Sequence, residues 1–234
     1  MVGRYLPENK FVPDLKQDFA VPKSDVEKLL HKVIDENIYP LKRSACLCLL
    51  LNFFLGLRVG ELAALTWHDV DLQRKVIRVY KTETKCYNRD ENGGRDGAMV
   101  YRVIEDTKTI YSVREVPLLP EAIYILQRLK EHHDACHYVD AFLAYDGHAT
   151  VLVRSLDRTL RKLCKYCEVN YFSTHMIRKT FATMLHASGM PTRFISDLLG
   201  HSEMITTERN YILTYQNNFN ALLGYMHEGL NFEL

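Results

Sequence analysis

The most apolar stretch of the chain is ACLCLLLNFFLGL, residues 45–57. Its 13 residues are too few to cross a bilayer as a helix, which takes about 20. Because the stretch carries almost no polar side chain, it is typical of a helix that is buried on all sides. We therefore expect a buried helix over about 41–56 that ends near Gly56.

Helical and extended patterns follow one another along the rest of the chain. Further helices are expected through 26–33 and over 58–65, 121–133, 150–167, 173–188 and 191–199. Strands are expected at 76–80, 99–105 and 113–118, with the polar, glycine-rich segment 88–97 as a hairpin tip between the first two. Helices, then strands, then helices predict a mainly helical α+β domain with a small three-stranded antiparallel sheet.

The overall composition excludes few functions. The 234 residues carry a net charge of +1, so charge alone does not indicate a nucleic-acid partner, although a basic face can be hidden in a balanced total. The start, MVGRYLPENK, lacks the apolar core of a signal peptide, and we expect a cytoplasmic protein with reduced cysteines. Cys164 and Cys167 have C-x-x-C spacing, and HHDACH (132–137) adds possible ligands, but the two cysteines also fit the apolar face of a helix. We expect no metal site and no cofactor.

Several polar residues lie at the edges of apolar elements, where packing gives little reason for them. They are Arg58 and Glu61 in GLRVGEL, Lys108 in DTKTIYSVREVPL, His175 and Arg178 in THMIRKT, His201 in LLGH and Tyr211 in TTERNY. Taken singly, each has an ordinary structural explanation, such as a surface ion pair or a solvated side chain. Together they suit phosphoryl transfer, because arginines bind phosphate oxygens, histidine and lysine move protons, and a tyrosine hydroxyl can attack phosphorus.

Four segments in this order resemble the signature segments of the tyrosine recombinases, the phage integrase family. They are GLRVGELAALTWHDVDL (56–72), TKTIYSVREVPL (107–118), THMIRKTFATML (174–185) and LLGHSEMITTERNY (198–211). The resemblance implies that Arg58, His175, Arg178 and His201 contact the scissile phosphate, that Lys108 is the general acid and that Tyr211 is the nucleophile. Glu61 would orient Arg58. The resemblance further implies double-stranded DNA as substrate, a tetramer on DNA and a possible accessory directionality factor.

The sequence also departs from the family pattern. Ile212 follows the tyrosine where many integrases have a short polar sequence, and the insertion at 81–100 resembles integrases of conjugative transposons and some phages. Lys81 and Lys85 in that insertion are rivals to Lys108. No segment has the length of the family's core-binding domain, so we expect a catalytic domain at 23–234 preceded by a linker at 1–22. A type IB topoisomerase and a non-catalytic DNA-binding module remain alternatives, although the H-x-x-R pair favours the recombinase.

Two surface features concern partners. Arg154, Arg158, Arg161 and Lys165 fall at helical spacing and predict a basic stripe that contacts DNA phosphates; a solvated helix face is the alternative. The apolar segment from 214 to about 229 either docks on a neighbouring protomer, as is common in the family, or folds back on its own chain.

Overall fold

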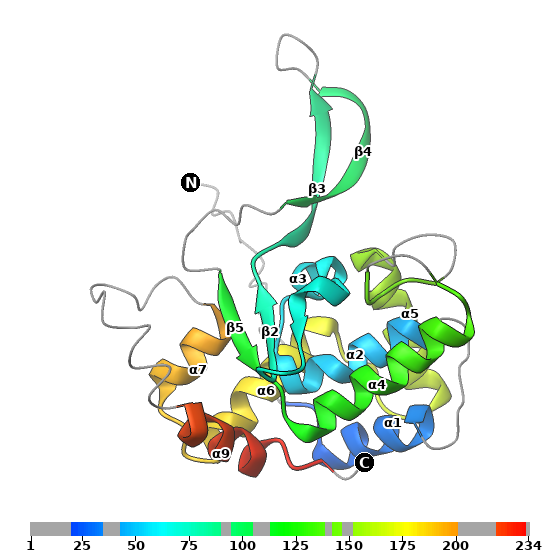
Figure 1. Cartoon of the computed structure of the whole chain (residues 1–234). Coiled ribbons are helices and arrows are strands. Elements are labelled where there is room, and N and C mark those ends of the chain that lie inside the picture. The colour runs from blue at the N-terminus through cyan, green and yellow to red at the C-terminus, as the bar shows by residue number, and fades with distance from the viewer. Residues whose placement is uncertain are drawn as a thin grey trace, which may run out of the picture.

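Helix α2 (Arg43–Leu55) has the buried position that its composition predicts. Every residue from Ser44 to Leu55 is buried. Helix α2 packs against α1 (Lys23–Ile34), α4 (Pro120–Ala135), α5 (Val153–Tyr166) and α6 (Thr174–Ala187), which surround it in Figure 1. The removal of apolar surface from contact with water around α2 is therefore a main source of stability for the helical body.

The computed structural model describes residues 20–34, 43–89, 95–104, 113–138, 142–146, 152–200 and 219–232. The remaining helices are α3 (Val59–Ala64), a 3-10 turn at Trp67–Asp69, α7 (Thr192–Leu199) and α9 (Phe219–Gly229). Each helix expected from the sequence is present, with ends that differ by a few residues. Within the described ranges, no helix is long and apolar enough to cross a membrane.

The strands form two separate antiparallel sheets. Strand β2 (Val76–Val79) lies between β1 (Val70–Asp71) and β5 (Arg114–Pro117) in a three-stranded sheet. Strands β3 (Thr82–Arg89) and β4 (Arg95–Ile104) pair with each other and form a ribbon that extends from the helical body (Figure 1). A three-stranded antiparallel sheet is present, as expected. The segment expected as a hairpin tip at 88–97 is partly strand, because β3 runs to Arg89 and β4 begins at Arg95, and residues 90–94 lie outside the described residues.

The membership of the sheets differs from the expectation in one respect. The segment expected as a strand at 99–105 is part of β4 and belongs to the ribbon, and the third strand of the sheet is the two-residue β1. β1 is too short to produce a pattern, and β3 reads TETKCYNR, without the apolar alternation of a half-buried strand.

The ends of the described chain pack on the helical body. Val21 is buried, and its N–H donates to Thr180 Oγ1 at 2.8 Å, while residues 1–19 of the expected linker lie outside the described residues. At the other end, α9 packs on α6 of the same chain, with Met226 and Leu230 buried. Phe232 meets Phe54 edge-on, with ring centroids 5.4 Å apart. The described part of the C-terminal segment therefore folds back in cis.

The turn after α2 places Arg58 at the start of α3. The Asn52 side chain accepts from the N–H of Leu57 at 2.8 Å and donates to its carbonyl at 3.1 Å. Gly56 has a φ of 62°, and a Cβ atom at this position would lie 2.3 Å from the ring of Phe181. Only glycine combines this backbone conformation with such a close approach.

We expect Gly56→Ala to destabilise the protein by roughly 3 kcal/mol, because a left-handed backbone and overpacking against Phe181 are both unfavourable. Urea denaturation followed by circular dichroism measures the effect. Gly224→Ala is the control: it lies on α9 with nothing within 4 Å of a Cβ, and helix propensity predicts a gain of up to about 1 kcal/mol. Equal stability of Gly56→Ala and wild type would contradict this account of the turn.

Candidate active site

Arg58 is half exposed and anchored on one side. It precedes the first residue of α3, and its backbone N–H donates to Glu61 Oε2 at 2.9 Å. Its guanidinium donates through Nη1 to Glu61 Oε1 at 3.0 Å and through Nη2 to the carbonyl of Gly200 at 3.1 Å. Because 46% of the side chain is exposed, the guanidinium remains accessible to a ligand. Glu61, expected from the sequence to orient Arg58, thus contacts both its backbone and its guanidinium.

Glu61 also receives a second arginine, Arg114 of β5. Arg114 donates through Nη2 to Glu61 Oε2 at 2.8 Å and through Nη1 to Glu61 Oε1 at 3.2 Å. Burial alone raises the pKa of Glu61, but the hydrogen bonds and charges of Arg114 and Arg58 outweigh it and hold this pKa below its usual range. The carboxylate therefore stays ionised and serves both arginines.

Arg178 is buried at the centre of the cluster. It donates through Nη1 to the carbonyl of Gly56 at 2.9 Å and through Nη2 to the carbonyl of Leu199 at 2.6 Å. Burial, with a further contribution from the charge of Arg58, lowers the pKa of Arg178 to about 9. His175 lies one turn earlier on α6 and is exposed, so the pair places its imidazole at the surface and its guanidinium inside.

Three arginines donate to the carbonyl groups at the C-terminal end of α7. Arg114 Nε donates to Leu198 at 2.6 Å, next to the contacts of Arg178 with Leu199 and of Arg58 with Gly200. These carbonyls lack partners within the helix and carry the negative end of its dipole, so cations are stabilised there. Three guanidinium groups and one carboxylate leave a net charge of +2, and this excess is suited to an anion.

Three of the expected catalytic residues, Lys108, His201 and Tyr211, lie outside the described residues. His201 directly follows Gly200, which has a φ of 66° and ends α7. The carbonyl that Arg58 contacts therefore belongs to the residue before His201.

The two rival lysines lie on β3 or just before it. Lys81 is buried, and its ammonium group pairs with Asp69 Oδ2 at 2.8 Å and donates to Thr66 Oγ1 at 2.8 Å. These contacts give Lys81 a structural explanation. Lys85 is exposed on the ribbon, opposite Tyr101 in the register.

The basic stripe lies on the exposed side of α5. Its four residues, Arg154, Arg158, Arg161 and Lys165, are all exposed, whereas Leu156, Leu160 and Leu163 are buried on the other face. The guanidinium of Arg161 lies 4.1 Å from the ring centre of Tyr171. On the buried face and just beyond the helix, Cys164 and Cys167 are free thiols in the core, as the apolar pattern predicted.

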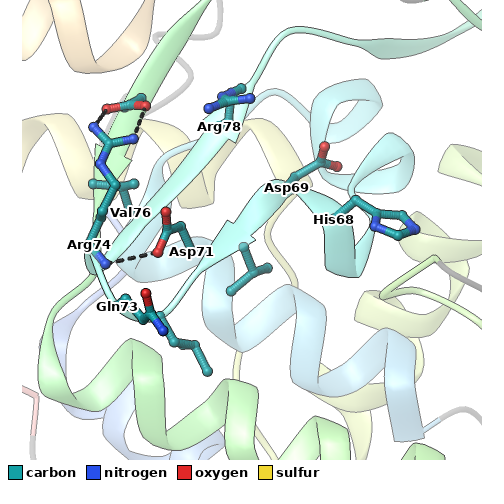
Figure 2. A pocket seen from close by; sticks show the side chains of 10 residues that line it. His68, Asp69, Asp71, Gln73, Arg74, Val76 and Arg78 are labelled. Atoms are coloured by element: carbon teal, nitrogen blue, oxygen red, sulfur yellow. Dashed lines mark hydrogen bonds and ion pairs between the residues drawn. The ribbon is translucent and has the colours of Figure 1, made fainter.

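A surface hollow of about 380 Å³ is shown in Figure 2. It lies on the face of the three-stranded sheet that is opposite to the arginine cluster. It is lined by residues 68–74 with Val76, Arg78 and Glu115. Arg74 closes one side by pairing with both carboxylate oxygens of Glu115, each at 2.8 Å. Adjacent strand residues point to opposite faces, so Glu115 faces this hollow while Arg114 faces the arginine cluster. Of the expected catalytic residues that the structure describes, Arg58, His175 and Arg178, none lines the hollow.

Sequence reasoning missed Arg114 and the backbone acceptors. Arg114 lies two residues before the buried Val116 in β5, at a position that alternation assigns to the inward face. A basic residue at an inward position of a strand is a signal that could have been used. No sequence signal indicated the carbonyls of Gly56 and Leu199, because a backbone acceptor depends only on chain path.

We expect Glu61→Gln to destabilise the protein by roughly 3 kcal/mol at pH 7, because it removes the anion from a buried ion-pair cluster. The folded-state pKa of Glu61 is lowered, so its contribution is present above the ordinary carboxyl pKa and disappears as pH falls through the folded-state value. The difference in unfolding free energy between the variant and wild type should therefore narrow below about pH 4. Glu115→Gln, which breaks an exposed pair with Arg74 that water screens, should change stability little. A pH-independent difference for Glu61→Gln would refute the role of its charge.

The sequence matches proteins of one kind along most of its length. A model of the phage integrase family matches residues 20–218. A XerC-like tyrosine recombinase of Caldanaerobacter subterraneus subsp. tengcongensis is 31% identical over 212 residues, which cover 82% of this chain and 52% of that protein. Tyrosine recombinase XerC of Listeria monocytogenes serovar 1/2a is 28% identical and covers 86% of this chain and 62% of that protein. The chain thus spans between half and two thirds of the length of these relatives.

Solved structures have a similar fold. The integrase of transposon Tn1549, in complex with a circular intermediate DNA, superimposes with a TM-score of 0.65 at 18% identity, covering 88% of this chain and 67% of that one. The XerA recombinase superimposes with a TM-score of 0.55 at 19% identity, covering 86% and 63%. The family match over 20–218 and the shared fold agree with the four signature segments: this chain belongs to the phage integrase family.

Proposed function

We propose that this chain is the catalytic part of a site-specific DNA recombinase that cleaves and rejoins strands during integration or excision of a mobile element. One observation carries the proposal. Arg58, directly before α3, and Arg178 of α6 are far apart in the sequence, and both donate to the end of α7, directly before His201. Two guanidinium groups in this arrangement can bind the nonbridging oxygens of one phosphodiester.

The reaction follows from the roles of these residues. The Tyr211 hydroxyl attacks phosphorus, the bond from phosphorus to the 5′ oxygen breaks, and the 3′ phosphate becomes esterified to the tyrosine. Lys108 gives a proton to the leaving 5′ oxygen, while His175 and His201 hydrogen-bond the phosphate or move protons, including the proton that leaves the Tyr211 hydroxyl. Arg58 and Arg178 stabilise the negative charge that grows on the nonbridging oxygens. A 5′ hydroxyl from another strand reverses the steps and rejoins the DNA.

The partners in this proposal are double-stranded DNA and further copies of the protein. The Tn1549 integrase, which shares this fold, was solved with a circular intermediate DNA. Recombination between two sites needs four cleavages, so the full-length protein would act as a tetramer, with a possible accessory directionality factor. Residues 23–234 would be the catalytic domain and residues 1–22 the connection to a core-binding domain.

Two other functions would use the same fold. A type IB topoisomerase would relax any supercoiled plasmid as a monomer, whereas a recombinase requires paired sites. A non-catalytic DNA-binding module would bind duplexes without forming a covalent adduct. The H-x-x-R pair of His175 and Arg178 favours the recombinase over the topoisomerase.

Tyr211→Phe should abolish covalent capture of DNA, since phenylalanine lacks the attacking oxygen. Nicked duplexes whose cleavage releases a short fragment trap the adduct, which denaturing gels detect after incubation at low salt with EDTA. Tyr124→Phe, an exposed tyrosine on α4, should form the adduct as wild type does. An equal adduct from Tyr211→Phe would assign the nucleophile to another residue, and DNA binding without any adduct from wild type would favour the binding module.

Replacing all four basic residues of the α5 stripe by glutamine should weaken binding to any duplex and flatten its salt dependence. If each residue contacts one phosphate, the slope of log affinity against log salt falls by about 3 to 4. Fluorescence anisotropy with a random duplex measures both quantities. The control replaces Arg128 and Lys130 on α4, which pair with Glu131 and Asp134. An unchanged slope for the α5 variant would mean that the stripe is only a solvated face.

A further inference from the structure

We propose that Arg114 is a positioning residue of the active site, one that holds Glu61 and the end of α7 so that Arg58 and Arg178 can bind one phosphate. The inference rests on the proposed function and adds a residue to it. Arg114 comes from β5, whereas the two arginines that would contact the phosphate come from α3 and α6.

The contacts of Arg114 join two parts of the site. Its two terminal nitrogens donate to the two carboxylate oxygens of Glu61, at 2.8 and 3.2 Å. Its Nε donates to the carbonyl of Leu198 at 2.6 Å. A Cβ on Gly200 would lie 3.0 Å from Arg114 Nη1, so the guanidinium also packs directly against the residue that precedes His201. A planar fork can make these contacts at once, which the ammonium group of lysine cannot do.

The contacts of Arg114 separate it from the residues that would touch DNA. Both of its terminal nitrogens donate to the Glu61 carboxylate. Arg178 is just as buried, at 6% exposed against 7% for Arg114, but its Nη1 lies 4.0 Å from Glu61 Oε2, and Arg58 is 46% exposed. Arg114 would therefore act through Glu61 and α7.

The carboxylate explains why this pairing matters for the chemistry. Glu61 Oε2 lies 4.0 Å from Arg178 Nη1, just beyond hydrogen-bonding distance. Without Arg114, Glu61 Oε2 would lose its donor at 2.8 Å and would compete with a phosphate for the donors of Arg178. Arg58 already donates to the other oxygen, Oε1, at 3.0 Å. Arg114 thus holds Glu61 Oε2 away from Arg178 and leaves that arginine to the substrate.

The test separates the rate of cleavage from the affinity for DNA. Single-turnover cleavage of the nicked duplex at saturating DNA gives the rate, and anisotropy gives the Kd. We expect Arg114→Met to cleave about 100-fold more slowly than wild type, as misplaced catalytic groups do, with its Kd changed by less than about threefold because Arg114 does not contact DNA. Arg114→Lys should cleave at a rate between those of wild type and Arg114→Met, and it replaces Arg114→Met in the test if that variant does not fold.

Chemical rescue and a matched control exclude a general loss of structure. Ethylguanidinium should restore cleavage by Arg114→Ala about tenfold more than sodium at equal ionic strength, since it supplies the missing charge and fork. Arg74→Met is the control. It breaks another bidentate arginine–carboxylate pair (Figure 2), with Glu115, which follows Arg114 and points to the other face of the sheet. This variant should cleave at the wild-type rate.

Each remaining outcome has one meaning. Cleavage by Arg114→Met at the wild-type rate, a loss of affinity as large as the loss of rate, or no rescue by ethylguanidinium would overturn the positioning role while wild-type cleavage upholds the proposed function. If wild type binds DNA but forms no adduct, the proposed function fails and the positioning role fails with it.

Discussion

Glu61 is a buried carboxylate between guanidinium groups, and the geometry of the site depends on it. Like charges that are brought together away from water repel one another strongly, so several buried or half-buried arginines require an anion among them. Helix α3 supplies Glu61 and carries Arg58 at its start, while β5 supplies Arg114. The relative positions of a helix and a strand that are separate in sequence are thus fixed through one side chain.

Backbone carbonyl groups supply the acceptors that Glu61 alone cannot provide for the three arginines. One carboxylate does not balance three arginines, and the remaining donors reach the carbonyls of residues 198–200 and of Gly56. The lowered pKa of Arg178, about 9, reports that its charge is held at a free-energy cost that these dipoles only partly offset. An anion bound beside Arg178 would remove that cost. The net positive charge of the cluster therefore suits an anionic ligand, as the proposed function requires.

Sequence reasoning succeeded where one physical effect dominates. Helix α2 is apolar throughout and α5 has one apolar and one basic face, so burial alone assigns both. It failed where structure depends on distant partners. Strand β3 is polar because it lies in a ribbon that contacts little of the core. Arg114 points inward because it pairs there with Glu61, which belongs to another element. The sequence indicated Arg58 and Arg178 through their residue type and their place in the motifs. It could not indicate the carbonyl groups at the end of α7 to which they donate, since backbone carbonyls have no sequence signature.

The root of the ribbon connects the arginine cluster to the basic helix. Gly60, two residues after Arg58, admits β3 so closely that a Cβ there would lie 2.6 Å from the carbonyl oxygen of Glu83. The buried Glu83 carboxylate in turn accepts from the N–H of Val153, the first residue of α5, at 3.3 Å for each oxygen. Burial raises the pKa of Glu83, and the helix N-terminus favours its charged form. The same short segment of β3 therefore contacts both α3 and α5 and holds the basic helix in place relative to the helix that follows Arg58.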